Sequence, residues 1–500
     1  MDLYTAGLPL ILDPNVILMM ILGTTCGVLI GALPGLTATI GVAVMTPLTF
    51  GMAAIPSFAL LLSVYCGATF GGSITSVLAK IPGTPANMMT AIDGYPLGQK
   101  GHAGKAIGLA TISSFIGGIV STVVLALFAP KIASMALEFS AQEYFSIAML
   151  GISIIAYISG KSMTKSLISG LLGLLVAVVG MDSMTGVQRF TFGNYELLSG
   201  VELIPALIGV FGLSEVLRNA AKGQKDILVT KQISKILPSK QEFKLVLPTI
   251  FRGTAIGTFI GAVPAVGGVT ASIVAYGIEK RISKTPDEFG KGSLRGIAAP
   301  ESANNSATGG AMIPMLTLGI PGDAVTAVLI GSLMLHGLTP GPLMFKNEMP
   351  TVSAIFILMA LANVAFLFIG LLGARYVAKI LAIPNNILMP VILLLCCVGT
   401  YGIRNSIFDL FVLLIFGAVG FLFDKIDVPS APLVLGLVLG KLIEDNFRRT
   451  LALSNGNSLT VFTRPISCFF LVATLLILCA PIIVKQARKI FKGNSAKQEV

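Results

Sequence analysis

The stretch that decides the fold occurs twice in this chain. Its first copy runs GALPGLT from Gly31 to Thr37, then FGGSITSVLAKIPGTP from Phe70 to Pro85. Its second copy runs GAVPAVG from Gly261 to Gly267, then TGGAMIPMLTLGIPGD from Thr308 to Asp323. In both copies Pro and Gly interrupt apolar chain at matching places. A broken helix in a bilayer frees backbone N–H and C=O groups that lipid cannot satisfy, so the breaks predict buried or watery surroundings.

The composition of the chain is that of a membrane protein. Of its 500 residues, 54% are hydrophobic and only 11% are charged, whereas soluble domains are about 25% charged. Many apolar runs reach the roughly 18 residues that suggest a membrane span. We therefore expect an all-α polytopic membrane protein with about 11 to 12 membrane segments. The paired breaks predict two inverted-topology repeats that contain broken helices or re-entrant hairpins.

Charge and cysteine content argue against several other classes. The net charge is +11, and six lysines lie between Lys222 and Lys244. We interpret this charge as that of cytoplasmic loops and expect no nucleic-acid partner. The six cysteines lie in apolar runs without CxxC spacing, which favours neither a disulfide framework nor a metal site. We expect no organic cofactor and no catalytic residue.

The basic linker divides the chain into a tandem pair. We predict a first transmembrane repeat at 15–220, a basic cytoplasmic linker at 221–244 and a second transmembrane repeat at 245–445. A final transmembrane helix at 464–485 and a cytoplasmic tail at 486–500 follow. These two parts have no counterpart in the first repeat.

The distribution of Lys and Arg predicts that the two repeats are inverted. The first repeat begins without a basic residue, whereas the second follows the six-lysine linker. The loop Pro47–Pro56 has no basic residue, but the equivalent loop Glu279–Arg295 has five. The positive-inside rule then places the N-terminus on the periplasmic side and the C-terminus in the cytoplasm. One segment disagrees, since Lys441–Arg464 falls outside and yet carries four basic residues.

The breaks are also the predicted binding site. A helix that starts after Gly83 or Gly322 presents free N–H groups and the positive end of its dipole, which favour an anion without any charged side chain. Two such helix ends facing each other would hold a carboxylate solute. The alternative interpretation is that Pro-Gly only kinks a packed helix, and that the small residues serve helix packing. Matching breaks in both repeats favour the binding site.

The candidate substrate- and ion-binding residues are the break residues and their small polar neighbours. Hydroxyl and carbonyl oxygens suit Na⁺, and N–H or O–H donors suit carboxylates. The set comprises Pro34, Gly35, Thr37, Gly72, Ser73, Pro82, Gly83, Thr84, Asn304, Asn305, Gly310, Pro321, Gly322 and Asp323.

The acidic residues near the breaks leave alternatives open. Asp323 heads an apolar helix, so it is either an N-cap or a ligand of a coupling Na⁺ near Asn304. Asp93 is interpreted as a turn residue of Asp93-Gly94-Tyr95-Pro96, and Glu301 as a helix cap. Thr84 is expected to N-cap a short helix that ends near Ile92.

Four blocks of sequence carry a resemblance to a known family. They read GALPGLTATIGVAVMTPLTFGM, YCGATFGGSITSVLAKIPGTPANMMTAIDGYP, EKRISKTPDEFGKGSLRGIAAPESANNSATGGAMIPMLTLGIPGD and LHGLTPGPLMF. With these blocks the chain resembles the large membrane subunit of the tripartite tricarboxylate transporters, the TctA family, from about Gly23 to Asp445. One departure is Ala265, where the second half of the family's members often has Gly.

The resemblance implies a bacterial inner-membrane permease for tricarboxylates or related carboxylates. It also implies uptake driven by a cation, usually Na⁺, and an elevator-like movement with alternating access. Two partners are implied: a small four-helix membrane subunit (TctB-like) and a periplasmic solute-binding protein (TctC-like). A related dicarboxylate-type permease is the nearest alternative. An intramembrane enzyme is disfavoured, because Gly72-Ser73 lacks a following Gly and the chain has no HExxH motif.

Overall fold

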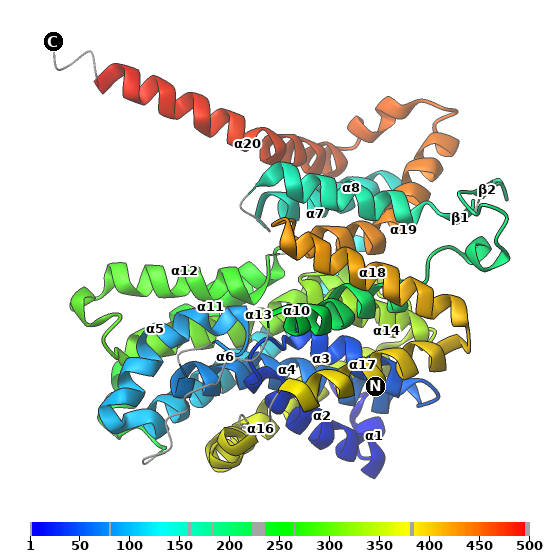
Figure 1. Ribbon diagram of the computed structural model, residues 1–500. Helices are drawn as coiled ribbons and strands as arrows, with labels where there is room; N and C mark the ends of the chain where they lie inside the picture. The colour runs from blue at the N-terminus through cyan, green and yellow to red at the C-terminus, as the bar shows by residue number, and fades with distance from the viewer. Residues whose placement is uncertain are drawn as a thin grey trace. The chain divides into compact units, whose positions relative to one another are not determined.

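The computed structural model in Figure 1 describes residues 3–79, 82–158, 162–182, 184–222, 236–264, 266–380 and 385–495. Most of the predicted linker therefore lies outside the described residues, as does Ala265. The rest is almost entirely helical, with one two-stranded antiparallel ribbon. This confirms the all-α polytopic class.

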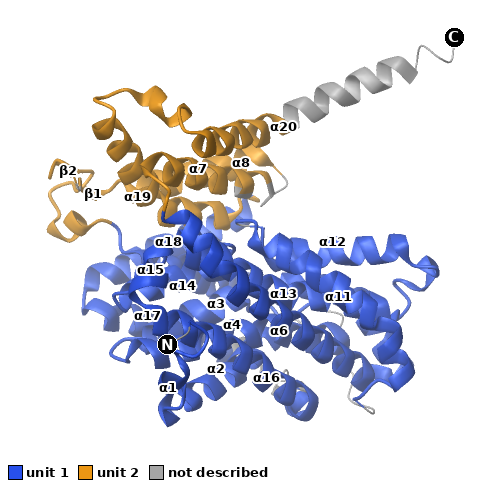
Figure 2. Ribbon diagram, turned by 180° about the vertical axis from the view of Figure 1, so that it is seen from behind, with its two compact units in different colours: residues 1–137, 201–426 blue, residues 138–200, 427–500 orange. Residues whose placement is uncertain are grey.

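The chain forms two compact units (Figure 2). Unit 1 comprises residues 1–137 and 201–426, and unit 2 comprises residues 138–200 and 427–500. Each unit thus takes residues from both predicted repeats. The division into repeats at 15–220 and 245–445 stays a prediction.

Unit 1 contains the helices on which the predicted site lies. Its first segment holds α1 (Leu8–Ile11), α2 (Pro14–Ala32), α3 (Ala38–Met45), α4 (Ala54–Ala79), the 3₁₀ turn η2 (Pro85–Asn87), α5 (Met88–Leu97) and α6 (Ala103–Ala136). Its second segment holds α9 (Leu203–Leu207), α10 (Ser214–Lys222), α11 (Lys240–Ala262), α12 (Gly267–Ile282), α13 (Leu294–Leu318), α14 (Ala324–Leu335), α15 (Pro342–Asn347), α16 (Met349–Ile380), α17 (Asn385–Arg404) and α18 (Ile407–Lys425).

Unit 2 is smaller. Its elements are α7 (Ala141–Ile158), α8 (Met163–Ala177), β1 (Gly180–Met181), β2 (Gln188–Arg189), α19 (Ser430–Leu453) and α20 (Pro465–Ser495). The helix α19 packs against both α7 and α8, and α20 packs against α7. The predicted final helix therefore begins as expected, but α20 continues past residue 485 into the predicted tail.

Eight helices among the described residues are long and apolar enough to cross a membrane. Their ranges are Pro14–Ala32, Ala54–Ala79, Pro85–Ala136, Leu203–Ala221, Lys240–Ala262, Met349–Val377, Ile387–Arg404 and Ile407–Lys425. Four shorter apolar helices accompany them at Ala38–Thr49, Met163–Ala177, Ala324–Leu335 and Pro465–Ala480. The short pieces include the parts of the chain where the sequence predicts hairpins and broken helices.

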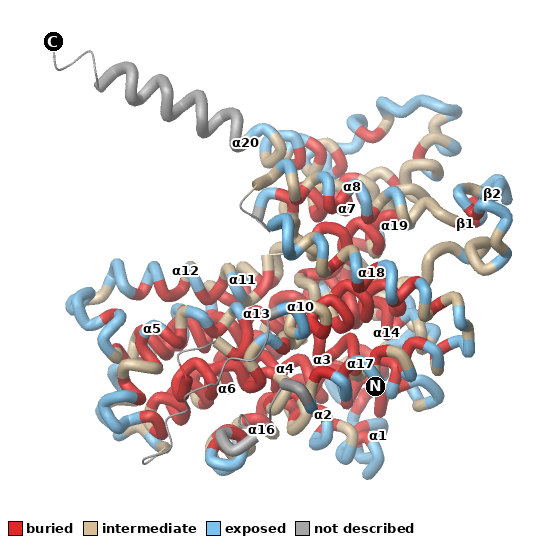
Figure 3. The backbone as a smooth tube through the Cα atoms, viewed as in Figure 1, coloured by how far each residue is buried: buried red, intermediate tan, exposed pale blue. Residues whose placement is uncertain are grey.

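Glycine spacing builds the same helix–helix interlock in both predicted repeats. In α2, Gly23, Gly27 and Gly31 lie against the backbone of α4, where an added Cβ would sit 2.3, 2.6 and 2.1 Å from carbonyl oxygens. In α11, Gly253, Gly257 and Gly261 lie against α13, at 2.6, 2.1 and 2.5 Å from carbonyl oxygens. Such four-residue spacing of small residues lets membrane helices approach closely. Both α4 and α13 are consequently buried along nearly their whole length (Figure 3).

One predicted turn is wrong. The sequence Asp93-Gly94-Tyr95-Pro96 was expected to end the short helix, but α5 continues through it to Leu97. The Asp93 side chain accepts hydrogen bonds from the N–H groups of Gly290, Gly292 and Ser293 at 2.8–2.9 Å. These long-range bonds hold the segment helical against its local turn preference.

The segment that disagreed with the charge rule, Lys441–Arg464, is not a single loop, because α19 extends through Leu453. Two of its arginines are paired with acids in unit 2. Arg448 pairs with Asp182, and Arg464 contacts Glu143 at 2.6 Å. The orientation of the chain in the membrane stays a prediction.

Candidate functional site

The first break joins α4 to α5 through closely packed glycines. The N–H of Gly83 donates to the carbonyl of Gly72 at 3.4 Å. A Cβ at Gly83 would lie 2.2 Å from the carbonyl oxygen of Gly31, and one at Gly72 would lie 2.2 Å from Oδ1 of Asn87. Only glycine fits at either position. Pro82 is half-buried beside them, while Lys80 and Ile81 belong to the part that the structure does not describe.

Thr84 lies at the N-cap position of η2, as the sequence predicts, but its hydroxyl does not bond to the backbone of that turn. No side-chain cap hydrogen bond forms; the hydroxyl donates to Oδ1 of Asn87 at 2.5 Å. Asn87 in turn donates to Oε1 of Glu301 at 3.0 Å. Asn87 is buried and was not among the predicted site residues, although it lies in the quoted stretch PGTPAN.

The second break joins α13 to α14. Gly319 ends α13 in the left-handed conformation with φ +70°, and Pro321 and Gly322 follow as buried residues. A Cβ at Gly322 would lie 2.5 Å from Cα of Ala311. Gly310 packs in the same way on Thr258 of α11. Gly310 therefore serves helix packing, which was the alternative interpretation of the small residues.

Asp323 is the N-cap of α14. Its Oδ1 accepts from the N–H of Thr326 at 2.8 Å, and the Thr326 hydroxyl accepts from the N–H of Asp323 at 2.8 Å. Its Oδ2 accepts from the hydroxyl of Tyr65 at 2.6 Å. Both carboxylate oxygens are thus bonded, and one bond comes from α4 of the first predicted repeat. The cap interpretation is confirmed, and Asp323 as an ion ligand stays a prediction.

The two adjacent asparagines of α13 have different surroundings. Asn304 donates to the carbonyl of Thr69 in α4 at 3.1 Å, which joins the two predicted repeats. Asn305 is only 1% exposed, and neither its amide nitrogen nor its amide oxygen has a hydrogen-bond partner. The hydroxyl of Ser73 in α4 is also buried without a partner. A buried polar atom without a partner needs an explanation, and a bound water, ion or ligand is one.

The first hairpin begins beside the first break, because the carbonyl oxygen of Gly31 lies against Gly83 and the Thr75 hydroxyl donates to the carbonyl of Ala32. Thr37 caps α3 by accepting from the N–H of Ile40 at 3.3 Å. Pro34 is half-buried, and Gly35 has φ +91° and lies against the carboxylate of Glu215. The second hairpin also lies at a break, because Gly267, with φ +66°, lies against Asp323. Gly35 and Thr37 thus contact Glu215 and Ile40 rather than a residue of the first break.

Glu301 is not a helix cap, contrary to expectation. It lies inside α13 with 0% exposure and accepts three hydrogen bonds from the first predicted repeat. The donors are Asn87 at 3.0 Å, the Thr90 hydroxyl at 2.5 Å and the Ser114 hydroxyl at 2.8 Å. A carboxyl group in the otherwise uncharged stretch GIAAPESANNSATGG was the available sequence signal. Its partners, more than 180 positions earlier, were not predictable.

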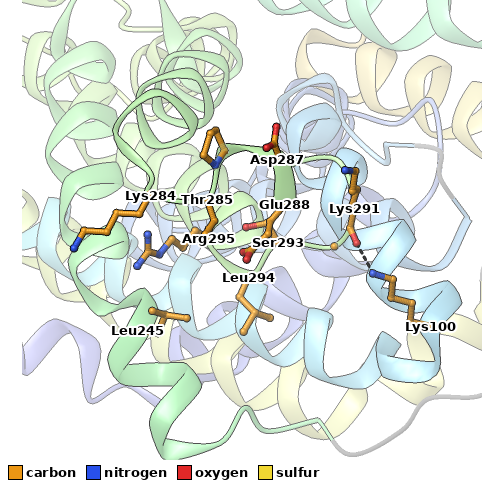
Figure 4. A pocket seen from close by; sticks show the side chains of 12 residues that line it. Lys100, Leu245, Lys284, Thr285, Asp287, Glu288, Lys291, Ser293, Leu294 and Arg295 are labelled. Atoms are coloured by element: carbon orange, nitrogen blue, oxygen red, sulfur yellow. Dashed lines mark hydrogen bonds between the residues drawn. The ribbon is translucent and has the colours of Figure 1, made fainter.

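A cavity of about 950 Å³ lies in the charged loop between α12 and α13 (Figure 4). Lys100, Lys284, Lys291 and Arg295 line it, together with Asp287, Glu288 and several uncharged residues. The Lys100 ammonium donates to the carbonyl of Lys291 at 2.7 Å. None of the predicted site residues lines this cavity. It belongs to the loop that Asp93 holds, not to the breaks.

Comparisons with known proteins find one matching family model and two similar proteins. The family model described as "Tripartite tricarboxylate transporter TctA family" matches residues 17–435. A protein of Agrobacterium vitis, described as "Uncharacterized 52.8 kDa protein in TAR-I ttuC' 3'region", is 37% identical over 488 residues, which are 97% of each chain. An "Uncharacterized protein in TAR-II ttuC' 3'region" from the same organism is 37% identical over 215 residues, 43% of this chain and 89% of that protein. No solved structure matches the chain.

Proposed function

We propose that this chain, which belongs to the tripartite tricarboxylate transporter TctA family, conducts a carboxylate solute past its two breaks by alternating access. The membership makes it a membrane component of a transporter and not an enzyme. The finer features are our proposal: Na⁺ coupling, delivery by a periplasmic binding protein, a small four-helix membrane partner, and a place in the bacterial inner membrane with the C-terminus in the cytoplasm.

One observation carries the proposal for the binding site. Ser73 and Asn305 are buried, lie on the two central helices α4 and α13, and leave three polar atoms without partners. Leaving a buried polar group unsatisfied costs about 1–3 kcal/mol per group. A bound solute or ion supplies the missing bonds.

The donor set fits both proposed occupants. The Ser73 hydroxyl and the Asn305 amide oxygen are hard oxygen ligands of the kind that Na⁺ takes. The Asn305 amide nitrogen is a donor for a carboxylate oxygen. The backbone N–H groups that begin η2 and α14 add positive potential for an anion. These residues would hold the solute and the cation together, so that binding one favours binding of the other.

Alternating access requires the breaks to change their surroundings. The predicted repeats pack closely on each other: α6 lies along α13, with Gly117 against the backbone of Ser302 and Gly309 against Ser121. Hydrogen bonds from Tyr65 to Asp323 and from Asn304 to the Thr69 carbonyl add to this packing. The contacts within each repeat are continuous glycine interlocks. A movement between the repeats therefore has to shift packed helix faces as well as these hydrogen bonds.

The test is solute uptake by the reconstituted complex. Liposomes that contain this chain with its small membrane partner, and the binding protein outside, are given labelled citrate under an inward Na⁺ gradient. Replacement of Na⁺ by K⁺ should abolish accumulation, and unlabelled succinate in excess should compete only if dicarboxylates share the site. Uptake at the same rate with every cation gradient would overturn the Na⁺ coupling.

A further inference from the structure

Glu301 is a buried carboxyl group that the proposed solute site does not use. It lies on α13 with 0% exposure, and its three hydrogen-bond donors are Asn87, Thr90 and Ser114. Within the described residues no Lys or Arg forms an ion pair with it. An ionised carboxylate removed from water costs several kcal/mol unless its environment compensates, and here the compensation comes from three uncharged donors.

The donors allow both protonation states without a change of fold. Three hydrogen bonds stabilise the ionised form. The hydroxyls of Thr90 and Ser114 are donors and acceptors alike, so either one can rotate to accept a hydrogen bond from a protonated carboxyl group. The amide of Asn87 cannot turn in this way, because its oxygen already accepts from Thr84. Protonation therefore weakens the bond to Asn87.

Most of the acidic and tyrosine side chains on the neighbouring elements are bonded to partners other than Glu301. From α5, Asp93 binds the loop at Gly290–Ser293, and Tyr276 of α12 donates to Asp93 at 2.9 Å. From α4, Tyr65 is bonded to Asp323. Lys105 of α6 pairs with Glu242 of α11, Arg252 of α11 pairs with Glu279 of α12, and Cys66 of α4 contacts Asn363. The other titratable residues on these elements are Tyr95, Lys131, Lys240, Lys244, Lys280, Arg281 and, at the start of α13 itself, Arg295.

The hydrogen bonds of Glu301 end at the first break. Asn87 closes η2, the turn that follows Pro82-Gly83, and Thr90 lies in the first turn of α5. The same Asn87 lies 2.2 Å from the position that a Cβ on Gly72 would take. A proton on Glu301 thus changes the bonds that position the first break. The coupling is reciprocal: the factor by which protonation of Glu301 changes the conformational equilibrium of the break is also the factor by which that conformational change alters the proton affinity of Glu301.

We propose that Glu301 takes up one proton and releases it in each transport cycle, so that proton movement is coupled to carboxylate movement. An O–H bond forms between a carboxylate oxygen and a proton from water on one side of the membrane. That bond breaks toward water on the other side. The inference rests on the proposed transport function, and the proton moves in addition to the Na⁺ proposed above.

The first experiment separates exchange from net transport. Liposomes that contain the reconstituted complex are loaded with citrate and a pH-sensitive dye, and the wild-type complex is compared with the Glu301→Gln complex. With equal pH on both sides, the rate of citrate exchange in Glu301→Gln should stay within about threefold of wild type. The acceleration of citrate uptake by an inward proton gradient should fall at least tenfold in Glu301→Gln. A Glu301→Gln complex that responds to the pH gradient as wild type does would overturn the proposal.

A matched pair of serines keeps the test decisive if Glu301→Gln does not fold. Ser114 donates to Glu301, whereas the neighbouring Ser113 hydroxyl is equally buried and has no partner. Ser114→Ala removes a bond to the ionised carboxylate, so the midpoint of the pH profile of citrate exchange should rise by about one pH unit. Ser113→Ala should leave the midpoint unchanged. Equal midpoints in wild type and Ser114→Ala contradict the proposal.

Failure of this proposal differs from failure of the transport function. If wild type accumulates citrate on a Na⁺ gradient but the dye records no proton movement with it, Glu301 carries no proton and the transport function stands. If wild type moves no carboxylate on any gradient, the transport function itself is wrong, and the proton coupling that rests on it is wrong too.

Discussion

A single methyl group at Gly83 should separate the first break from the helix pair that holds it. In Gly83→Ala the Cβ would lie 2.2 Å from the carbonyl oxygen of Gly31 and 2.6 Å from Cα of Gly72. Favourable contact begins near 3.5 Å, so the backbones must separate by roughly 1 Å. Both atoms are backbone atoms of interlocked helices, and neither can rotate away. Overpacking of this kind costs about 1–3 kcal/mol.

The assay measures stability and uptake on the same preparation. We expect the apparent unfolding temperature of the detergent-solubilised Gly83→Ala protein to fall by a few degrees, and citrate uptake to fall at least tenfold. Gly277→Ala is the matched control, because that helical glycine of α12 has nothing within 4 Å of an added Cβ. Its stability should rise by up to about 1 kcal/mol. If Gly83→Ala matches Gly277→Ala in both measurements, the close approach of Gly83 to Gly31 is not real.

Three further outcomes follow from the contacts described. Tyr65→Phe should lower stability by about 1.5–3 kcal/mol, because the carboxylate of Asp323 loses a hydrogen bond; an unchanged unfolding temperature would count against that bond. Asn305→Leu should keep or raise stability while abolishing citrate uptake, since it removes only unsatisfied polar atoms; normal uptake would exclude Asn305 from the site. The N–H of Thr185 lowers the pKa of Asp182 to about 2 from an ordinary 3.8, so Asp182→Asn should lose stability relative to wild type above about pH 4. That difference should vanish as the pH falls to about 2, as unfolding temperatures measured at each pH will show.

The sequence predicted the features that depend on neighbouring residues alone, namely the helix breaks and several helix caps. The Pro-Gly pairs at Pro82-Gly83 and Pro321-Gly322 end or begin helices, because proline lacks an N–H and glycine tolerates close approach. Thr37 and Asp323 cap the helices that follow them, as small polar residues ahead of apolar runs do. The helical class, the positions of the breaks and several caps were therefore within reach of the sequence.

The sequence did not predict the hydrogen-bond partners of the buried polar residues. Asp93 was expected in a turn, but its bonds to the loop before α13, nearly 200 positions later, keep its helix intact. Glu301 was expected as a cap, but its three donors belong to the other predicted repeat. A side chain's choice between a local bond and a distant one depends on the tertiary packing, which a single sequence does not display.

The pattern of these distant bonds restricts how the breaks can move. Each break is held by a residue of the opposite repeat: Glu301 bonds to Asn87 beside the first, and Tyr65 bonds to Asp323 at the second. If the first break moved alone, Glu301 would lose Asn87 and Thr90, two of its three donors, while still buried, which is costly for an ionised carboxylate. A proton on Glu301, or a compensating movement of α13, removes that cost. We infer that the two breaks move together, or that a proton binds before they separate.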